Sequence, residues 1–423
     1  MTAAQTQAPV PPVPQVPEPT PAPSRWREAW TRVASGNALV SLLAVVAAVI
    51  VGSIMIALTD SDVQTAAGYF FQRPGDTFSA IGSAVGGAYA ALFRGSIYNV
   101  NADSFAIGIR PFTETLKFAT PLIAAGLGVG LAFRAGLFNI GGQGQMLMAA
   151  AAAGYVATTW NLPFPLHMLA ALAAGLVAGA IWGGIAGLLK ARTGAHEVIV
   201  TIMLNHIAFY LLAWMLATQG LLQAPGSNNP KTAAMAESAV LPQILGPTYK
   251  LHLGFLFALI AVAITWWLLE RSNLGFRFRA VGENPAAART AGISVGRMYF
   301  LVMVIAGALV GLAGVSQALG TEPGGFGGGI DAGIGFDAIT VALLGRSRPI
   351  GILFAGLLFG AFKTGGFTMQ ASQGVPIEIV LVVQSLIVLF IAAPPLVRAM
   401  FGVPQPGRPS RRQRRAVKKE VAA

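Results

Sequence analysis

Nine long apolar segments limit what this chain can fold into more than any other feature of its sequence. A helix needs about 20 apolar residues to cross the hydrocarbon core of a bilayer. Segments close to that length occur at 38–58, 115–133, 144–160, 166–189, 198–218, 252–269, 298–319, 350–367 and 376–396. A tenth, 335–344, is too short for a full crossing and is expected to be a partial helix sheltered by protein. Together they predict an all-α polytopic membrane protein with about ten transmembrane segments.

Composition agrees with this fold class and excludes several kinds of site. Hydrophobic residues make up 55% of the chain and charged residues only 10%, unlike a soluble domain. The chain has no cysteine, which excludes disulfides, thiolate metal sites and cysteine nucleophiles. It also has no Gly-Lys dipeptide, and therefore no phosphate-binding loop of the Walker A type. Energy from ATP would have to come through another polypeptide.

The two ends of the chain differ from its middle, 37–397, which we assign to one transmembrane domain. Residues 1–36 begin with a Pro-rich stretch that cannot bury a core, and we expect a disordered cytoplasmic N-terminus. Residues 398–423 form a basic cytoplasmic tail, which favours retention on that side and attraction to anionic membrane lipid. No folded basic domain accompanies the tail, so nucleic acid is not an expected partner.

The distribution of basic residues predicts the topology. Ten crossings with a cytoplasmic N-terminus place 21 of the 28 Lys and Arg residues on the cytoplasmic side and six outside. Omitting the short segment 335–344 would put the basic tail outside. The positive-inside rule therefore favours ten crossings with both termini cytoplasmic. The segment 270–297 then forms a cytoplasmic loop between two spans.

Two glycine-rich stretches punctuate the chain at corresponding places. GLFNIGGQGQ at 136–145 precedes the third span, and GGFGGGIDAGIGFD at 324–337 precedes the eighth. Ten crossings divide into two five-helix halves of opposite orientation, and transporters with inverted repeats line their pathway with such irregular backbone. The alternative is that glycine only allows close helix packing.

The polar loop between Arg271 and Arg297 has the local chemistry of a short helix. Asn284 can cap the first free amides, Pro285 suits the first helical position, and Gly292 can end the helix in a left-handed conformation. We expect roughly two helical turns at the membrane surface. The simpler alternative is a basic loop lying on lipid.

Four motifs carry a family resemblance. GLFNIGGQGQ at 136–145, GAHEVIVTIMLNHIA at 194–208, AVGENPAAARTAGI at 280–293 and GFDAITVALLGRSRPIG at 335–351 occur in this order. They resemble the permease subunits of ABC importers for nucleosides and simple sugars, within the larger group that includes branched-chain amino-acid and ribose permeases. The resemblance runs from about Leu116 to Pro395. This chain has Gln143 where the family usually has Glu, which removes a charge near the inner gate.

The resemblance implies that the cytoplasmic loop carries a coupling helix, which docks into a groove of the ATPase. The residues that match this motif are Glu283, Asn284, Pro285, Ala287, Arg289 and Gly292. The implied partners are a cytoplasmic ABC ATPase with two nucleotide sites, a second homologous permease subunit, and an extracytoplasmic substrate-binding protein that docks on the loops 59–114 and 219–251. ATP and magnesium would be bound by the ATPase, so this chain is expected to hold no cofactor and to catalyse no reaction.

The same resemblance implies a bacterial cytoplasmic (inner) membrane as the location. It favours nucleosides as the substrate, then sugars, then branched-chain amino acids. An ion-coupled secondary carrier is a rival reading, since it would also have inverted repeats and buried acids, but it would have no use for a rigid cytoplasmic helix. A membrane-embedded enzyme would need a converging catalytic set, and the sequence shows none.

Polar residues at membrane depth are candidates for the translocation pathway, because isolated polar groups are costly there. Those beside the glycine-rich stretches, together with one on the fifth span, are Asn139, Gln143, Gln145, Asn205 and Asp337. Gln384, on the last span, is expected to be peripheral. Glu197 is most simply an acid favourable to the start of its helix, with gating as the alternative. His196 and Glu197 begin like a zinc-protease helix, but Val200 stands where the second His is required, so no metal site is expected.

The predicted topology can be tested in this naturally cysteine-free chain. Single cysteines are introduced by Ser227→Cys, Ser294→Cys and Ser410→Cys and probed on intact cells with an impermeant thiol reagent. Only Ser227→Cys is expected to react. Position 227 lies in the 219–251 loop, which is predicted to be outside, whereas positions 294 and 410 are predicted to be cytoplasmic. Labelling of Ser410→Cys would require an odd number of crossings.

Overall fold

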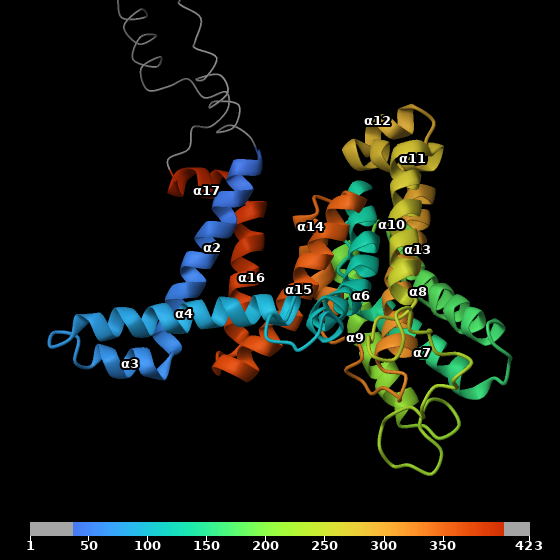
Figure 1. The fold of residues 1–423 in the computed structure, drawn as a ribbon. Coiled ribbons are helices and arrows are strands. Elements are labelled where there is room, and N and C mark those ends of the chain that lie inside the picture. The colour runs from blue at the N-terminus through green and yellow to red at the C-terminus, as the bar shows by residue number, and fades with distance from the viewer. Residues whose placement is uncertain (1–36, 402–423) are drawn as a thin grey trace, which may run out of the picture. The chain divides into compact units, whose positions relative to one another are not determined.

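The structure of the chain, a computed structural model, describes residues 37–401 (Figure 1). The expected disordered N-terminus, 1–36, and most of the basic tail, 402–423, lie outside the described residues. The chain divides into two compact units, each held together by its own internal contacts. One contains the residues up to Ala44 and those from Pro394 onward, and the other is Val45–Ala393. In the first, the structure describes the beginning of α2 and the short helix α17 (Pro394–Met400). The second unit contains the features discussed below.

Residues 37–401 are helical without any β-sheet, as the apolar segments predict. The longer helices are α2 (Asn37–Thr59), α4 (Pro74–Ser96), α6 (Arg110–Arg134), α7 (Gly142–Thr159), α8 (Leu166–Thr193), α9 (Glu197–Leu216), α10 (Gly254–Arg271), α11 (Asn273–Glu283), α13 (Val295–Ser316), α14 (Ile334–Leu344), α15 (Pro349–Gln373) and α16 (Ile377–Ala392). Short helices are α3 (Ser61–Ala67), α5 (Phe105–Gly108) and α12 (Pro285–Thr290), and a π-helical turn, Gln317–Thr321, continues α13.

Every predicted span coincides with a helix, and most of these helices meet the requirements for crossing a bilayer. Six are long and apolar enough: those formed by α6 with α5, by α13 with its π turn, and by α8, α9, α10 and α15. Two pairs of helices separated by short breaks, α2 with α3 and α16 with α17, could each add one more. The two remaining predicted segments are α7, of 18 residues, and the short apolar helix α14. The polytopic all-α prediction is confirmed, and the count of ten stays a prediction.

The region 59–114 differs from the loop that was expected. It contains α3, the 23-residue α4 and α5. The sequence signal for α4 was present, since Pro74 begins the helix, Asp76 lies in its first turn and Arg94 in its last. Its small residues, such as Ala88 and Ala91, are buried, whereas Phe78 is exposed. The helix was missed because its apolar residues are too small and too dispersed to form a long hydrophobic run.

Helices α8 and α13 cross with their backbones in contact. Glycines recur every fourth residue along one face of α8, at 175, 179, 183 and 187, and they face α13. A side chain at Gly179 would meet the main chain of Gly307, and one at Gly307 would meet the main chain of Gly179. Lipid tails are as apolar as leucine, so helices in a membrane associate through close packing of this kind. Close approach of these two helices therefore holds the centre of the bundle.

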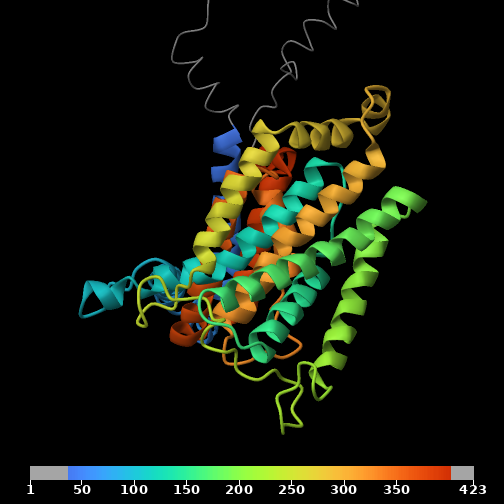
Figure 2. The same ribbon diagram turned by 90° about the vertical axis from the view of Figure 1, so that its right-hand side faces the viewer.

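The two predicted halves interleave and do not form separate bundles. Helix α8 from the first half packs on α13 from the second, α6 packs on α15, and α7 touches α14. Helix α9 contacts mainly α7 and α8 and lies at the edge of the bundle (Figure 2). Helices α11 and α12 lie at one end of the spans and the 219–251 segment at the other (Figure 1). The inverted relation between the halves stays a prediction.

Candidate functional site

The segment 270–297 folds as its local chemistry predicts. Helix α12 begins at Pro285, and the side-chain Oδ1 of Asn284 accepts hydrogen bonds from the amides of Ala286 and Ala287, both at 3.0 Å. Gly292 follows the helix with φ of 80°, a left-handed conformation that costs glycine little. The helix has 6 residues and ends at Thr290, close to the expected two turns. Its start and its stop are both set by residues within one turn of each end.

Helix α12 presents nearly all of its surface to solvent. Among its residues only Ala288 is buried, at 4% exposure, where it packs with Phe278 and Val281 of α11 and with Val295 of α13. Glu283, Asn284, Pro285, Ala287, Arg289 and Gly292 are all exposed. Helix α11 was not predicted separately; its N-cap is Ser272, whose hydroxyl accepts the Gly275 amide at 2.9 Å. A small exposed helix is therefore held on a packed base.

The base of α12 touches the first glycine-rich stretch directly. A side chain at Gly282, near the end of α11, would collide with the carbonyl of Arg134, and one at Gly136 would lie 3.2 Å from Gly282. Both glycines allow two main chains to meet. A displacement of α11 and α12 would therefore press on the backbone that enters the 136–145 stretch.

Three of the candidate pathway residues form one buried network. Asn139 and Gln145 exchange side-chain hydrogen bonds at 3.2 and 3.3 Å, and Asn139 also accepts the Gly141 amide at 2.9 Å. Asn205 of α9 accepts the Gly144 amide at 2.8 Å and donates to the carbonyl of Ile140 at 2.9 Å. The three side chains are at most 3% exposed. Their amides satisfy irregular backbone that would otherwise be unpaired in the membrane.

This network also gives the depth of the glycine-rich stretch. Asn205 is the ninth residue of the 20-residue span α9. Because it binds the amide of Gly144 in the first turn of α7, that turn lies about half-way along α9. The 136–145 stretch therefore enters the bundle to mid-span, as an irregular backbone enclosed by protein.

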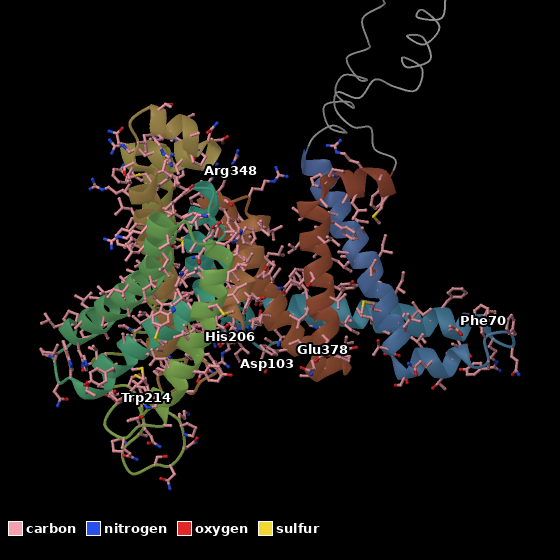
Figure 3. All side chains as sticks on the ribbon, turned by 180° about the vertical axis from the view of Figure 1, so that it is seen from behind. Phe70, Asp103, His206, Trp214, Arg348 and Glu378 are labelled. Atoms are coloured by element: carbon pink, nitrogen blue, oxygen red, sulfur yellow. The ribbon has the colours of Figure 1, made fainter. Side chains whose placement is uncertain are left out.

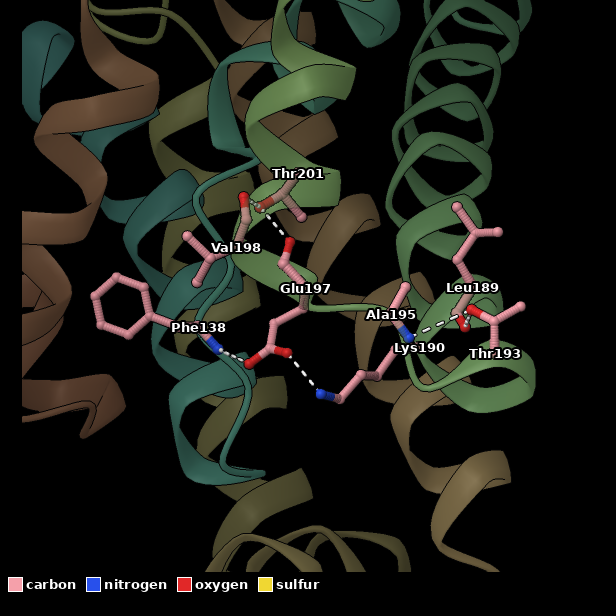
Figure 4. Close-up of polar contacts among 8 residues, drawn as sticks. All are labelled: Phe138, Leu189, Lys190, Thr193, Ala195, Glu197, Val198 and Thr201. Atoms are coloured by element: carbon pink, nitrogen blue, oxygen red, sulfur yellow. Dashed lines mark hydrogen bonds and ion pairs between the residues drawn. The ribbon is translucent and has the colours of Figure 1, made fainter.

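Glu197, at the start of α9, also binds the 136–145 stretch. Its Oε2 pairs with Nζ of Lys190 at 2.8 Å, and its Oε1 accepts the amide of Phe138 at 3.4 Å (Figure 4). Lys190 belongs to the last turn of α8 and Glu197 to the first turn of α9. The predicted position at the start of a helix is confirmed. The sequence could not show the contact with Phe138, which joins the glycine-rich stretch to the α8–α9 corner.

The two glycine-rich stretches meet at Gly142 and Gly335. A side chain at Gly142 would lie 2.8 Å from the carbonyl of Gly335, and one at Gly335 would collide with the backbone of Gln143. The side chain of Gln143 forms a hydrogen bond with Asp331, a residue that is 6% exposed. Gln143 can donate to a carboxylate, whereas a glutamate at this position would add a like charge beside Asp331.

Asp337 opens onto a cavity of about 300 Å³ beside this meeting point. The cavity lies among α6, α14, α15 and α16, and it is lined by Leu122, Ala332, Gly333, Asp337, Phe359, Phe362, Lys363, Ile377, Val380, Leu381 and Gln384. Lys363 donates from Nζ to the carbonyl of Ala332 at 3.2 Å. A carboxylate, an ammonium group and an amide thus border a mostly apolar cavity, an arrangement that can orient a polar solute by hydrogen bonds.

The position of Gln384 corrects the sequence analysis. It was expected to be peripheral, yet its side chain is 9% exposed and lines the same cavity as Asp337. Helix α16 is apolar around most of its surface, so its sequence alone does not show which face meets α14 and α15. Asn139, Gln145 and Asn205 hold irregular backbone, and their contact with a solute stays a prediction.

Comparison with known proteins places these features in a family. A family profile described as "Branched-chain amino acid transport system / permease component" matches residues 111–392. The guanosine ABC transporter permease protein NupP of Bacillus subtilis is 39% identical over 321 residues, which cover 76% of this chain and 89% of the relative. The nucleoside ABC transporter permease protein NupB of Lactococcus lactis is 37% identical over 302 residues, covering 69% and 81%.

A third relative, a glucose ABC transporter permease protein of Haloferax volcanii, is 38% identical over 292 residues, which cover 66% of this chain and 75% of the relative. No solved structure matches the chain. The match to the family profile includes α12, both glycine-rich stretches and the cavity residues.

The buried network predicts a specific loss of stability. Asn205→Ala leaves the Gly144 amide and the Ile140 carbonyl without partners, which costs about 1–3 kcal/mol for each buried group. We expect the melting temperature of the purified protein to fall by about 5 °C or more. His206→Ala, a change at the exposed neighbouring position, serves as the control and should melt like the parent. Equal melting temperatures for all three proteins would contradict this role.

Proposed function

The chain belongs to the family of branched-chain amino acid transport system permease components, and from this premise we propose that it forms half of the membrane pathway of an ATP-driven importer. As a member of this family it is a multi-pass membrane permease component of an ABC transport system. The second half of the pathway would come from a homologous permease subunit. A cytoplasmic ATPase with two nucleotide sites would hydrolyse ATP, so this chain would itself make or break no covalent bond.

The observation that carries this proposal is the exposed helix α12 on its packed base. A helix with one buried residue does not stabilise the fold by its own burial, so its exposed face is available to another molecule. Asn284 and Gly292 give it a defined start and stop, which suits a rigid docking element. We assign the groove of the ATPase as its partner, with Glu283, Pro285 and Arg289 on the docking surface.

A continuous set of contacts leads from α12 toward the cavity. Helix α11 meets the first glycine-rich stretch at Gly282, and that stretch meets α14 at Gly142 and Gly335. Asp337 on α14 then borders the cavity. When ATP closes the ATPase, movement of α12 would be passed through these backbone contacts to the walls of the cavity. The two permease subunits would thereby change from inward-facing to outward-facing, and solute would enter from the external binding protein.

The external binding protein would dock at the opposite end of the spans. A cavity of about 460 Å³ there is lined both by residues of the 59–114 region, such as Asn99 and Arg110, and by Thr248 and Lys250 of the 219–251 segment. The two regions thus form one continuous surface. We further propose that both termini lie in the cytoplasm and that the protein resides in the inner membrane of a bacterial cell.

Nucleosides are the proposed substrates, with simple sugars as the next candidates. Relatives named for guanosine and for nucleosides are matched over 89% and 81% of their lengths, and one named for glucose over 75%. The cavity supports a ligand of this class. Asp337 and Gln384 can accept and donate hydrogen bonds to hydroxyl groups or to the edge of a base, and Phe362 provides an aromatic wall. Branched-chain amino acids would add a carboxylate close to Asp337.

Substitutions at the junction of α11 and α12 test the coupling to ATP. Glu283→Arg or Pro285→Gly is expected to reduce ATP-dependent uptake about tenfold or more while the protein still reaches the membrane, since losing ~1.4 kcal/mol of docking energy has that effect. Uptake is measured in vesicles that contain the complete complex. Arg192→Glu, at an exposed position in the last turn of α8, is the charge-reversal control. Uptake by this chain alone, driven by an ion gradient and unchanged by both substitutions, would mean a secondary carrier.

Substitutions in the cavity test the substrate site separately. Asp337→Leu and Gln384→Leu should each lower guanosine uptake about fivefold, because one lost hydrogen bond costs about 1 kcal/mol. Ser385→Leu, at the exposed next position on α16, should leave uptake unchanged. Expression and assembly of the complex are checked first. Parental uptake in both cavity variants would place the solute elsewhere, and uptake of glucose or leucine without guanosine would overturn the choice of substrate.

A further inference from the structure

A third cavity, larger than the two described above, lies at the end of the spans near α11. Its volume is about 1000 Å³, at the upper end of the ~300–1,000 Å³ typical of small-molecule sites. It is lined by Arg134, Trp266, Glu270, Arg271, Arg279, Arg348, Pro349, Ile350 and Gly351. None of these residues belongs to the cavity that contains Asp337, and none lies on α12.

The cavity carries an excess of positive charge. Its walls hold four arginines and one glutamate, Glu270, which pairs with Arg279 at 3.5 Å. Within residues 37–401, no acidic side chain forms an ion pair with Arg134, Arg271 or Arg348. The guanidinium of Arg271 lies 5.9 Å from the ring of Trp266. Three positive charges are therefore left to attract an anion.

Two of the arginines are held in place by backbone carbonyls. Arg134 donates from Nε to the carbonyl of Ser347 at 3.0 Å, which leaves its terminal nitrogens free to bind a ligand. Arg279 donates to the carbonyl of Leu269. Ile350 and Gly351 in the first turn of α15 also line the cavity, and their amides have no carbonyl partner within the helix. The site is thus partly preorganised for a group with several acceptor oxygens.

The cavity lies where the membrane meets water. Arg134 is the last residue of α6, Arg271 is the last residue of α10, and Arg348 immediately precedes α15. All three helices are candidate spans. Arg348 lies at the same end of the structure as α11 and α12, while Trp214 near the end of α9 lies at the opposite end (Figure 3). An anion bound here would be at the level of lipid headgroups.

Exposed apolar side chains continue from the cavity along the spans. Trp266 is 40% exposed and Ile350 53% exposed, and both also line the cavity. One turn farther along α15, on the same face as Ile350, Phe354 is 65% exposed. The site therefore combines a cationic head region with an apolar face that begins within one turn. A phosphate dissolved in water would use only the first of these.

We propose that the cavity between α6, α10, α11 and α15 binds an anionic phospholipid from the adjacent leaflet. Its phosphate contacts the guanidinium groups of Arg134, Arg271 and Arg348, and its acyl chains lie against Trp266, Ile350 and Phe354. A zwitterionic phospholipid fits less well, because its ammonium group would be repelled by the same arginines and it brings no net negative charge. Basic cavities between spans at the cytoplasmic surface are suited to anionic headgroups.

The bound lipid would join the ends of three spans to α11. Arg279 of α11 faces the cavity, and α11 leads directly to α12. Occupancy of the site would therefore stabilise the base of α12 relative to the ends of α6 and α15. This inference does not depend on the substrate or on the presence of the ATPase, so it can be tested on the isolated chain.

The test measures binding of phosphatidylglycerol to the purified full chain in detergent, by native mass spectrometry and by the rise in melting temperature. Phosphatidylcholine and inorganic phosphate are the comparison ligands. The double variant Arg271→Gln/Arg348→Gln should bind phosphatidylglycerol roughly 30-fold more weakly, since each arginine contributes about a factor of five. Neither residue was shown to hold a backbone carbonyl, so the fold should survive these changes.

The matched control is Arg192→Gln/Arg277→Gln, which removes the same charge from two exposed arginines at the same end of the spans but outside the cavity. It should bind phosphatidylglycerol like the parent. Equal binding by both double variants would overturn the proposal. So would a melting-temperature rise with inorganic phosphate equal to that with phosphatidylglycerol, which would indicate a site for soluble anions. Parental lipid binding by the cavity variant, combined with loss of ATPase assembly, would identify a protein-docking surface instead.

Discussion

Where α8 crosses α13, Gly179 and Gly307 bring two main chains into contact, and the remainder of the bundle is arranged around this crossing. In lipid, apolar side chains gain little by leaving one apolar environment for another, so the number of close contacts decides how helices associate. Glycine maximises those contacts because nothing separates the backbones. The absence of side chains likewise lets Gly142 and Gly335 come into contact, where the two glycine-rich stretches meet in the interior of the protein.

Irregular backbone at mid-span is possible only because protein encloses it and satisfies its polar groups. Asn139, Gln145 and Asn205 perform that task for the first stretch, and Glu197 holds its beginning. The buried polar residues therefore have two different roles: some bind backbone within the protein, and another borders a cavity. The three amides have their hydrogen bonds inside the protein, whereas Asp337 borders open volume.

The two glycine-rich stretches of this interior connect an exposed helix with a cavity. Through Gly282 the first stretch touches the base of α12, and through Asp337 the second stretch reaches the cavity. The arginine-lined cavity lies beside the same base, where α11 meets the ends of α6, α10 and α15. In the mechanism that we propose, motion of α12, a solute in the cavity and the charge of the surrounding lipid would therefore act on one connected part of the molecule.

The sequence by itself determined the features that depend on a few neighbouring residues. The spans follow from the length of apolar runs, and α12 follows from Asn284, Pro285 and Gly292, because helix caps need only residues within a turn. Only the tertiary structure decided which polar groups share a site. The placement of Gln384 depends on the rotation of α16 against α14 and α15, and the arginine cavity requires three span ends to converge. Such convergence is set by packing between segments far apart in the chain, which no local pattern records.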